Sequence, residues 1–134
     1  MVIYRGTELR IDGGGDLSSL GSTIADTLKI GVSGLDLDLV GASNNRFTNI
    51  ESIDMRGVGS NALSLGVQDL LDLSDSTDNL FVRGDAAGVD SVDVAGLGFS
   101  SAGTKLMAGV TYADYTVAGF NLHLFVEQNV TVLV

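Results

Sequence analysis

The sequence predicts an all-β protein built from short strands. Apolar and polar residues alternate over runs of about three to five residues, which is the period of a half-buried strand. Glycine, serine and asparagine separate these runs, and the 134 residues include 18 glycines and no proline. Short strands with Gly and Asn corners favour a β-solenoid or β-roll-like module, and a β-sandwich is the alternative.

Two apolar runs at the centre of the chain, residues 50–55 and 63–65, show the pattern most clearly. A turn-rich spacer of glycine, serine and asparagine separates them. Ile50 and Ile53 are three positions apart, which breaks strict alternation, so we expect a bulge or corner between them and Glu51 on the buried side. We expect Glu51 to accept hydrogen bonds from backbone amides of the turn, and cation binding is the other possibility.

Other strands are expected on both sides of this centre. They are residues 2–4, 8–11, 26–30, 35–39, 80–82 and 90–94. In residues 35–39 the leucines are expected to face the core and the aspartates the solvent. Residues 17–25 are small and uncharged, and they predict one helical turn or an irregular loop.

Two segments depart from the short-strand pattern. Residues 66–74 have Val67, Leu70 and Leu71 at helical spacing, which predicts a short helix or 3₁₀ turn. Residues 95–104 are rich in glycine and serine. From residue 105 onward the strands are longer and more aromatic, with a tight hairpin expected at Ala118-Gly119. We expect this last part to be an antiparallel segment that caps the module.

Composition excludes several classes of function. Seventeen acidic residues against seven basic ones give a formal charge of −10, which argues against binding nucleic acid or anionic lipid. No apolar run approaches the ~18 residues of a membrane span. The chain has no cysteine, so it has neither a disulfide nor a thiolate zinc site. It is long enough for one domain, residues 1–134, and we expect that domain to be monomeric.

An ordered series of segments carries a family resemblance. The series is IDGG, DTLKI, LDLDL, NIESIDMRGVGSNALSL, QDLLDLSDSTDNLFVRGDA and DSVDV. It resembles a module near the C-terminal ends of giant bacterial repeats-in-toxin adhesins, which are exported by type I secretion. The resemblance covers roughly residues 11–134 and is most specific at 49–85. It implies an extracellular location on the bacterial surface and a place beside other, calcium-stiffened domains of one long chain.

The chain departs from that family at its calcium-binding nonapeptide, G-G-x-G-x-D-x-L-x. Gly13-Gly14 and Asp26-Thr27-Leu28 match its two ends, but residues 15–25 lie between them. Some adhesins of this kind carry a ligand-binding domain inserted into a host module, called a split domain. Because insertion succeeds at exposed loops of small residues, residues 15–25 are the expected insertion point.

Aspartates in turns are the candidate calcium ligands, because carboxylate oxygens suit a hard cation. The candidates are Asp12, Asp16 and Asp26 around the glycine turn, and Asp72, Asp75 and Asp78 in the acidic run that begins within the predicted helix. Asp69 continues this run, and Asp85 and Asp90 flank a third turn. Helix capping and Asx turns are the alternative role for these residues.

Other recognisable residues have a structural explanation close at hand. Arg83-Gly84-Asp85 spells the tripeptide that integrins read, but Arg83 continues a strand and Gly-Asp begins its turn. His123 is the only histidine, and we expect it to pack on a strand. Tyr4, Tyr112 and Tyr115 are the only candidate platforms for a sugar.

The residues contain no catalytic signature, so no enzyme activity is expected. The sequence predicts a structural module that supports or hosts a ligand-binding domain. A carbohydrate- or peptide-binding module in its own right is the alternative. An enzyme such as a solenoid lyase needs clustered basic residues with carboxylates, and basic residues are scarce here.

Overall fold

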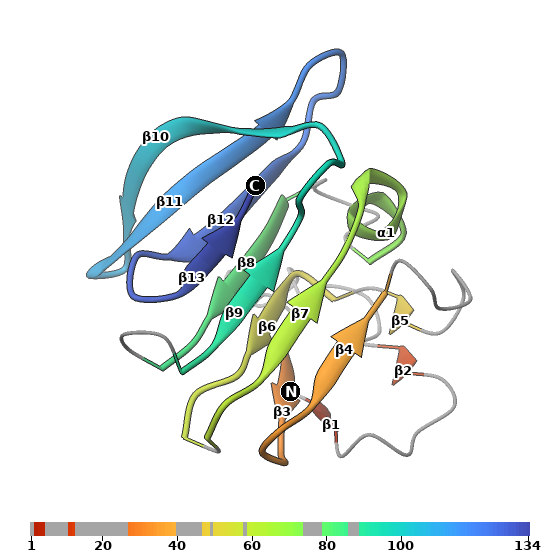
Figure 1. Ribbon diagram of the computed structural model, residues 1–134, viewed down its shortest axis with the longest axis vertical. Coiled ribbons are helices and arrows are strands. Elements are labelled where there is room, and N and C mark those ends of the chain that lie inside the picture. Colours follow the sequence, from red (N-terminus) through yellow and green to blue (C-terminus); the bar gives the residue numbers. More distant parts are fainter. Residues whose placement is uncertain are drawn as a thin grey trace, which may run out of the picture.

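A computed structural model gives the fold of the chain (Figure 1). It describes residues 2–4, 11–12, 27–39, 47–48, 50–57, 59–73, 79–85 and 89–134, with the backbone alone for 2–4, 11–12 and 47–48. The described part is all-β with one short helix, as the sequence predicts. Two layers of strands enclose the core, and the chain passes from one layer to the other at short corners (Figure 1).

The larger layer is a seven-stranded sheet in the order β1-β3-β6-β8-β12-β11-β10. Neighbouring strands are parallel from β1 to β12, and the last two pairings, β12–β11 and β11–β10, are antiparallel. The strands of this sheet are Val2–Tyr4 (β1), Thr27–Ile30 (β3), Ser52–Asp54 (β6), Asn79–Arg83 (β8), Phe99–Met107 (β10), Val110–Val117 (β11) and His123–Glu127 (β12).

The smaller layer is a four-stranded, wholly parallel sheet in the order β13-β9-β7-β4. Its strands are Asp36–Asp38 (β4), Ala62–Ser64 (β7), Ser91–Asp93 (β9) and Thr131–Leu133 (β13). Ile11–Asp12 (β2) and Phe47–Thr48 (β5) form a separate parallel pair. Each pass of the chain thus adds one strand to each layer, as in β3–β4, β6–β7, β8–β9 and β12–β13.

The core is made of aliphatic side chains stacked across the strands. Parallel pairing in register places equivalent positions of successive strands beside each other. One stack in the larger sheet is Leu28, Ile53, Val82 and Val126, all 0% exposed. The facing stack in the smaller sheet is Leu37, Leu63, Val92 and Val132. The two stacks face each other between the layers, and together they form one continuous hydrophobic cluster.

The helix α1, Val67–Leu73, confirms the helical prediction for residues 66–74. Leu70 and Leu73 are its buried residues, and Val67 and Leu71 pack at the edge of the core. Residues 35–39 also behave as predicted, since Leu37 and Leu39 are buried and the two aspartates are exposed.

The predictions differ from the structure most in the last third of the chain. The glycine- and serine-rich residues before 105 belong largely to β10, which begins at Phe99. The tight turn lies at Ala108 and Gly109, whose φ values of 51° and 78° suit a two-residue hairpin with both centres left-handed. The hairpin expected at Ala118-Gly119 is antiparallel, but its connection extends over residues 118–122.

Most neighbouring strands pair in parallel, whereas the sheets of the alternative β-sandwich are antiparallel. The solenoid itself stays a prediction. The predicted strand at residues 8–11, apart from Ile11, and the predicted loop at 15–25 lie outside the described residues. No described helix has the length and apolar character needed to cross a membrane.

Candidate functional site

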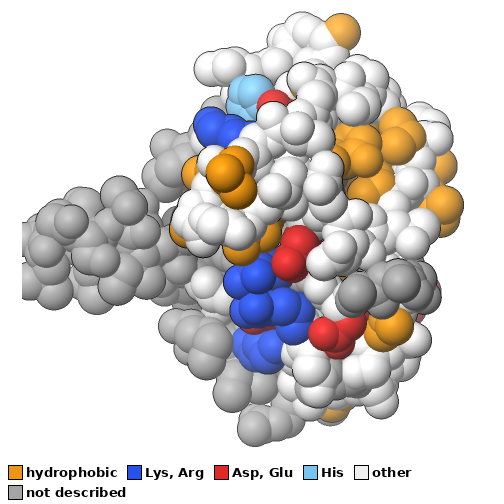
Figure 2. Space-filling model, turned by 90° about the vertical axis from the view of Figure 1, so that its left-hand side faces the viewer, with side chains coloured by type: hydrophobic (Ala, Val, Ile, Leu, Met, Phe, Trp, Pro, Cys, Tyr) orange, Lys and Arg blue, Asp and Glu red, His pale blue; other side chains and the backbone are white. Residues whose placement is uncertain are grey.

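The outer face of the seven-stranded sheet carries a row of charged and polar side chains, one from each of six neighbouring strands (Figure 2). In strand order it is Lys29, Asp54, Arg83, Glu127, Tyr112 and Lys105. Like charges directly opposite each other on neighbouring strands repel, and opposite charges attract. The alternating signs in the first four positions therefore stabilise the parallel register.

Asp54 pairs with two positively charged side chains, Lys29 from the row and Arg56, which lies just after β6. Arg56 donates to it through Nε at 2.9 Å and Nη2 at 2.8 Å, and the Arg56 backbone N–H adds a bond of 3.0 Å. Lys29 Nζ lies 3.5 Å from the same carboxylate and also donates to the Arg56 carbonyl. Burial alone would raise the pKa of Asp54, but the bonds and charge of Arg56 and the charge of Lys29 lower it to about 2.

Glu127 closes the other end of the ion-pair row. Its carboxylate accepts from Arg83 at 3.2 and 3.3 Å and from the Gly84 backbone N–H at 3.3 Å. A hollow of about 330 Å³ opens beside this pair, lined by Arg83, Glu127 and residues 109–111, 128 and 129. Because Arg83 and Glu127 neutralise each other, the hollow offers hydrogen-bonding groups and little net charge.

Aromatic rings occupy the next row of the same face. Phe81 stacks on Phe125 at 4.9 Å between centroids and meets Tyr112 edge to face at 5.5 Å. His123 stacks on the other side of Phe125 at 5.4 Å, and its Nδ1 lies 2.9 Å from Asp114 Oδ1. His123 therefore packs on a strand as predicted. Tyr112 is only 7% exposed, so it offers no open platform for a sugar ring.

A polar ladder runs along the corners between the two layers. Asn61 accepts a hydrogen bond from the Leu35 backbone N–H at 2.9 Å, and Asp90 accepts one from the Asn61 backbone N–H at 2.8 Å. The three residues stand immediately before β4, β7 and β9, so the corner before each of these strands is bonded to the corner before the neighbouring strand. Val130 holds the same place before β13, and it is apolar. Asp90 is completely buried, and its second oxygen accepts from Asp85 N–H at 2.6 Å.

Asp72 is the one predicted calcium ligand whose side chain belongs to the described part of the chain. The side chain of Asp12 and all of Asp16, Asp26, Asp75 and Asp78 lie outside what the structure describes. Asp72 accepts from Gln68 Nε2 at 3.0 Å on the helix surface. Among the described residues no three carboxylate, histidine or cysteine side chains form a group that could hold a metal ion. The calcium prediction therefore stays a prediction.

Three other acidic residues have structural roles that the sequence left open. Asp69 accepts from the Gly66 backbone N–H at 2.7 Å and so caps the start of α1. Asp85 accepts from the Gly57 N–H at 2.8 Å, and Asp90 belongs to the corner ladder. In Arg83-Gly84-Asp85, the arginine, the glycine amide and the aspartate are thus each engaged within the fold.

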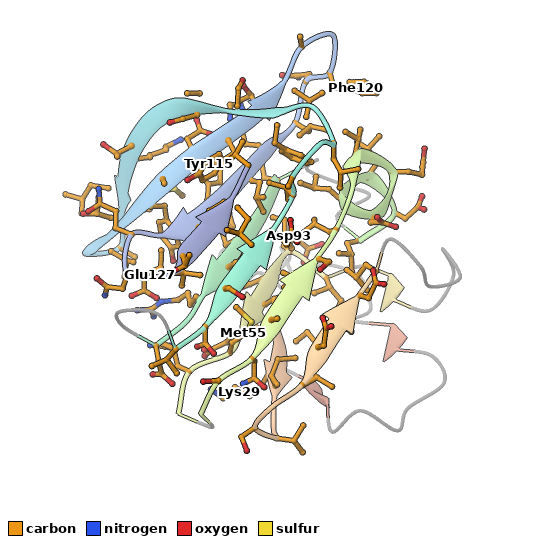
Figure 3. The ribbon with its side chains drawn as sticks, viewed as in Figure 1. Lys29, Met55, Asp93, Tyr115, Phe120 and Glu127 are labelled. Carbon is orange, nitrogen blue, oxygen red and sulfur yellow. The ribbon has the colours of Figure 1, made fainter. Side chains whose placement is uncertain are left out.

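Glu51 is 6% exposed, which confirms the predicted burial of this residue. Its expected bonds to turn amides stay a prediction. Tyr115 projects from β11 and packs against the core (Figure 3), and the side chain of Tyr4 lies outside the described part. None of the three tyrosines that could stack on a sugar is therefore shown as an open platform.

The corner ladder and the charged row were missed from the sequence, although a signal for the ladder was present. The segments LDLDL, NALSL, DSVDV and VTVLV repeat one pattern, in which the first residue occupies the corner position before the strand. Aligning them would have placed Asn61 and Asp90 at equivalent buried corners.

Comparison of the chain with models of protein families, with curated proteins and with solved structures finds no match.

Proposed function

We propose that the chain is a structural module of a large secreted bacterial adhesin, supporting or hosting a ligand-binding domain and performing no catalysis. What supports this is the way its polar groups are used. Asp54, Asp90 and Glu127 accept bonds from backbone amides, and two of them also hold arginines. Such groups stabilise a framework, whereas catalysis or ligand binding needs polar groups left open to a substrate.

A short β-solenoid is the architecture that fits this role. The strands β3, β6, β8 and β12 in one layer follow the same order as β4, β7, β9 and β13 in the other. We interpret each consecutive pair as one coil, closed at its corner by the rung of the polar ladder. A stack of coils transmits contacts from one end to the other and accepts extra chain at its loops, which suits a host module.

Calcium binding belongs to the same proposal. The formal charge is −10 on a chain of 134 residues, so the acidic side chains repel one another. A divalent cation bound between turn aspartates would offset part of this repulsion. The six candidate aspartates are Asp12, Asp16, Asp26, Asp72, Asp75 and Asp78.

The host role is tested by inserting a small folded domain at two places. An insertion between Leu17 and Thr23 is expected to leave soluble yield and melting temperature close to those of the parent, because a longer surface loop costs only ~0.6 kcal/mol per doubling. An insertion within residues 50–55 separates the completely buried Ile50 and Ile53 and should prevent folding. Equal loss of folding in the two insertion variants would mean that residues 17–23 belong to the core and do not host a domain.

The hollow beside Arg83 and Glu127 favours one alternative, a module that itself binds a carbohydrate or peptide. Its polar lining could hydrogen-bond hydroxyls or a peptide backbone. A glycan array decides between the two functions, because a pure scaffold binds no glycan above background. Specific binding that is lost in Asn129→Ala, while the melting temperature is unchanged, would favour the alternative.

A further inference from the structure

The two layers end at different strands on the C-terminal side of the molecule. The smaller sheet stops at β13, whose partner in the larger sheet is β12 of the same coil, whereas the larger sheet continues through β11 and β10 (Figure 1). The hairpin β10–β11 therefore projects past the end of the smaller sheet as a step. At this step two strand edges are open among the described residues: the outer edge of β10 in one layer and the outer edge of β13 in the other.

The face of the hairpin that looks into the step is uncharged. Its residues are identified by their register with Tyr115 and Val117, which pack against the core. They are Phe99, Ser101, Thr104, Leu106, Thr111, Ala113, Tyr115 and Val117. Leu106 is 70% exposed, and the side chains from Ser100 to Leu106 are all exposed. A strand that is open on both faces and along one edge is a ready template for pairing.

Charge is distributed so that this end can approach a second acidic molecule. Residues 99–134 have Lys105, Asp114 and Glu127 as their charged side chains, so they contribute −1 of the formal −10. By register and contacts, all three lie on the opposite, outer face of the sheet.

We propose that two copies of this chain associate through their steps. A two-fold axis parallel to the strands exchanges the two layers, so the projecting hairpin of each copy enters the space beyond β13 of the other. In this arrangement the β10 edge of each copy pairs with the β13 edge of its partner. The dimer therefore contains two equivalent pairings of these strands. The sequence alone favours a monomer, and the step gives a physical reason to revise that expectation independently of the proposed function.

A second copy fits the step better than a single extended peptide does. A lone strand could pair with β13 or with β10, but it would leave the other edge open. The copy supplies an edge in each layer and an uncharged face between them, and an interface of this kind meets its own equivalent across a two-fold axis. Its acidic bodies lie away from the contact, so salt should screen their repulsion and strengthen the association.

Sedimentation equilibrium of the whole chain, up to roughly 100 µM, tests the association. We expect a monomer–dimer equilibrium whose association constant rises between low and high salt. Ser101 and Ser100 provide a matched pair, because the first faces the step and the second faces outward on the same strand. Ser101→Glu should weaken association at least tenfold, and Ser100→Glu, with the same charge added, less than threefold. A chain that stays monomeric throughout, or equal effects of the two variants, would overturn the proposal.

Cross-linking identifies the strands that meet. The chain has no cysteine, so single cysteines can be added at Thr104 on β10 and Thr131 on β13. A short bis-maleimide should join Thr104→Cys chains to Thr131→Cys chains in a mixture far more than it joins either variant to itself. Preferential coupling of Thr104→Cys to itself would place β10 against β10 and exclude the stepped arrangement.

Discussion

Asp54 is a single residue whose ionisation is linked to folding. Arg56 and Lys29 hold its pKa at about 2, against an ordinary value of 3.8. A carboxyl group with a lowered folded pKa adds stability above its unfolded pKa, and this stability disappears as pH falls toward the folded pKa. The contribution is about 1–2 kcal/mol once screening around the half-exposed Arg56 is allowed for.

We therefore predict that Asp54→Asn flattens the fall in stability between pH 5 and pH 2. The free energy of unfolding, measured from urea midpoints at several pH values, should decrease less in the variant than in the parent. Arg56→Gln should flatten the same part of the curve, because it removes the partner that lowers the pKa. Parent-like pH profiles in both variants would show that the ion pair adds nothing to the fold.

Individual residues were predictable where a local pattern decided their position. The burial of Glu51 follows from alternation around Ile53, and the packing of His123 follows from the strand around it. The burial of Asp90 could not be found in this way, because its partner Asn61 is 29 positions away. An aspartate in a turn has the same local sequence pattern whether its corner is buried or open to solvent.

The helix α1 depends on Asp69 at its first turn. Burial, together with the charges of Asp72 and Asp38, raises the pKa of Asp69, although its bond from the Gly66 amide acts in the opposite direction. A raised folded pKa means that ionisation costs stability as pH rises above 3.8. An uncharged acceptor in the same place would keep the cap and remove that cost.

Asp69→Asn is accordingly predicted to leave stability at pH 7 unchanged or to raise it by up to ~0.5 kcal/mol. Asp69→Ala, which removes the acceptor, should lower it by about 1 kcal/mol. Urea unfolding at pH 7 compares the two, and any gain in the Asn variant should vanish below pH 3.8. Equal losses in both variants would mean that the charge itself matters to the helix.

The strands of this fold should differ sharply in how much stability is lost when one of their leucine side chains is shortened to alanine. Leu63 in β7 is 0% exposed and Leu106 in β10 is 70% exposed. Leu63→Ala is predicted to cost ~2–5 kcal/mol through lost burial and a cavity, and Leu106→Ala less than ~0.5 kcal/mol. Urea midpoints at a dilution where the chain is monomeric make the comparison. A similar loss in both would mean that β10 is packed within the core.

The elements themselves were predictable to different degrees. Alternating leucines were enough to predict β4, and the helical spacing of apolar residues was enough to predict α1. The start of β10 was missed because glycine and serine dominate it, and these residues ordinarily mark turns. Here Gly103, with φ of 116°, instead occupies a bulge within the strand, a place where glycine is tolerated.

The whole molecule carries its charge unevenly, and this leads to a prediction about cations. Most of the acidic residues lie before residue 99, where the candidate calcium ligands are. Millimolar Ca²⁺ is expected to raise the melting temperature relative to EDTA, because a ligand at a hundredfold excess over its dissociation constant adds ~2.7 kcal/mol. Mg²⁺ at the same concentration is the control for simple screening. Identical melting in Ca²⁺, Mg²⁺ and EDTA would argue against a specific site.

At this scale the all-β class could be predicted, because it follows from the short period of the apolar pattern. The direction of pairing could not, since an alternating strand looks the same beside a parallel or an antiparallel neighbour. The step at the C-terminal end was equally hidden, because it depends on which strands join which layer.

The stacking of strands in one direction also determines how the module would respond to tension. β1 lies at one end of the stack, and β13 lies near the other, with the two chain ends marked in Figure 1. A force between Val2 and Val134 would act along the hydrogen bonds that join successive strands, so it would load them one strand at a time. The module would then lengthen coil by coil at modest force, dissipating a sudden pull in several small events.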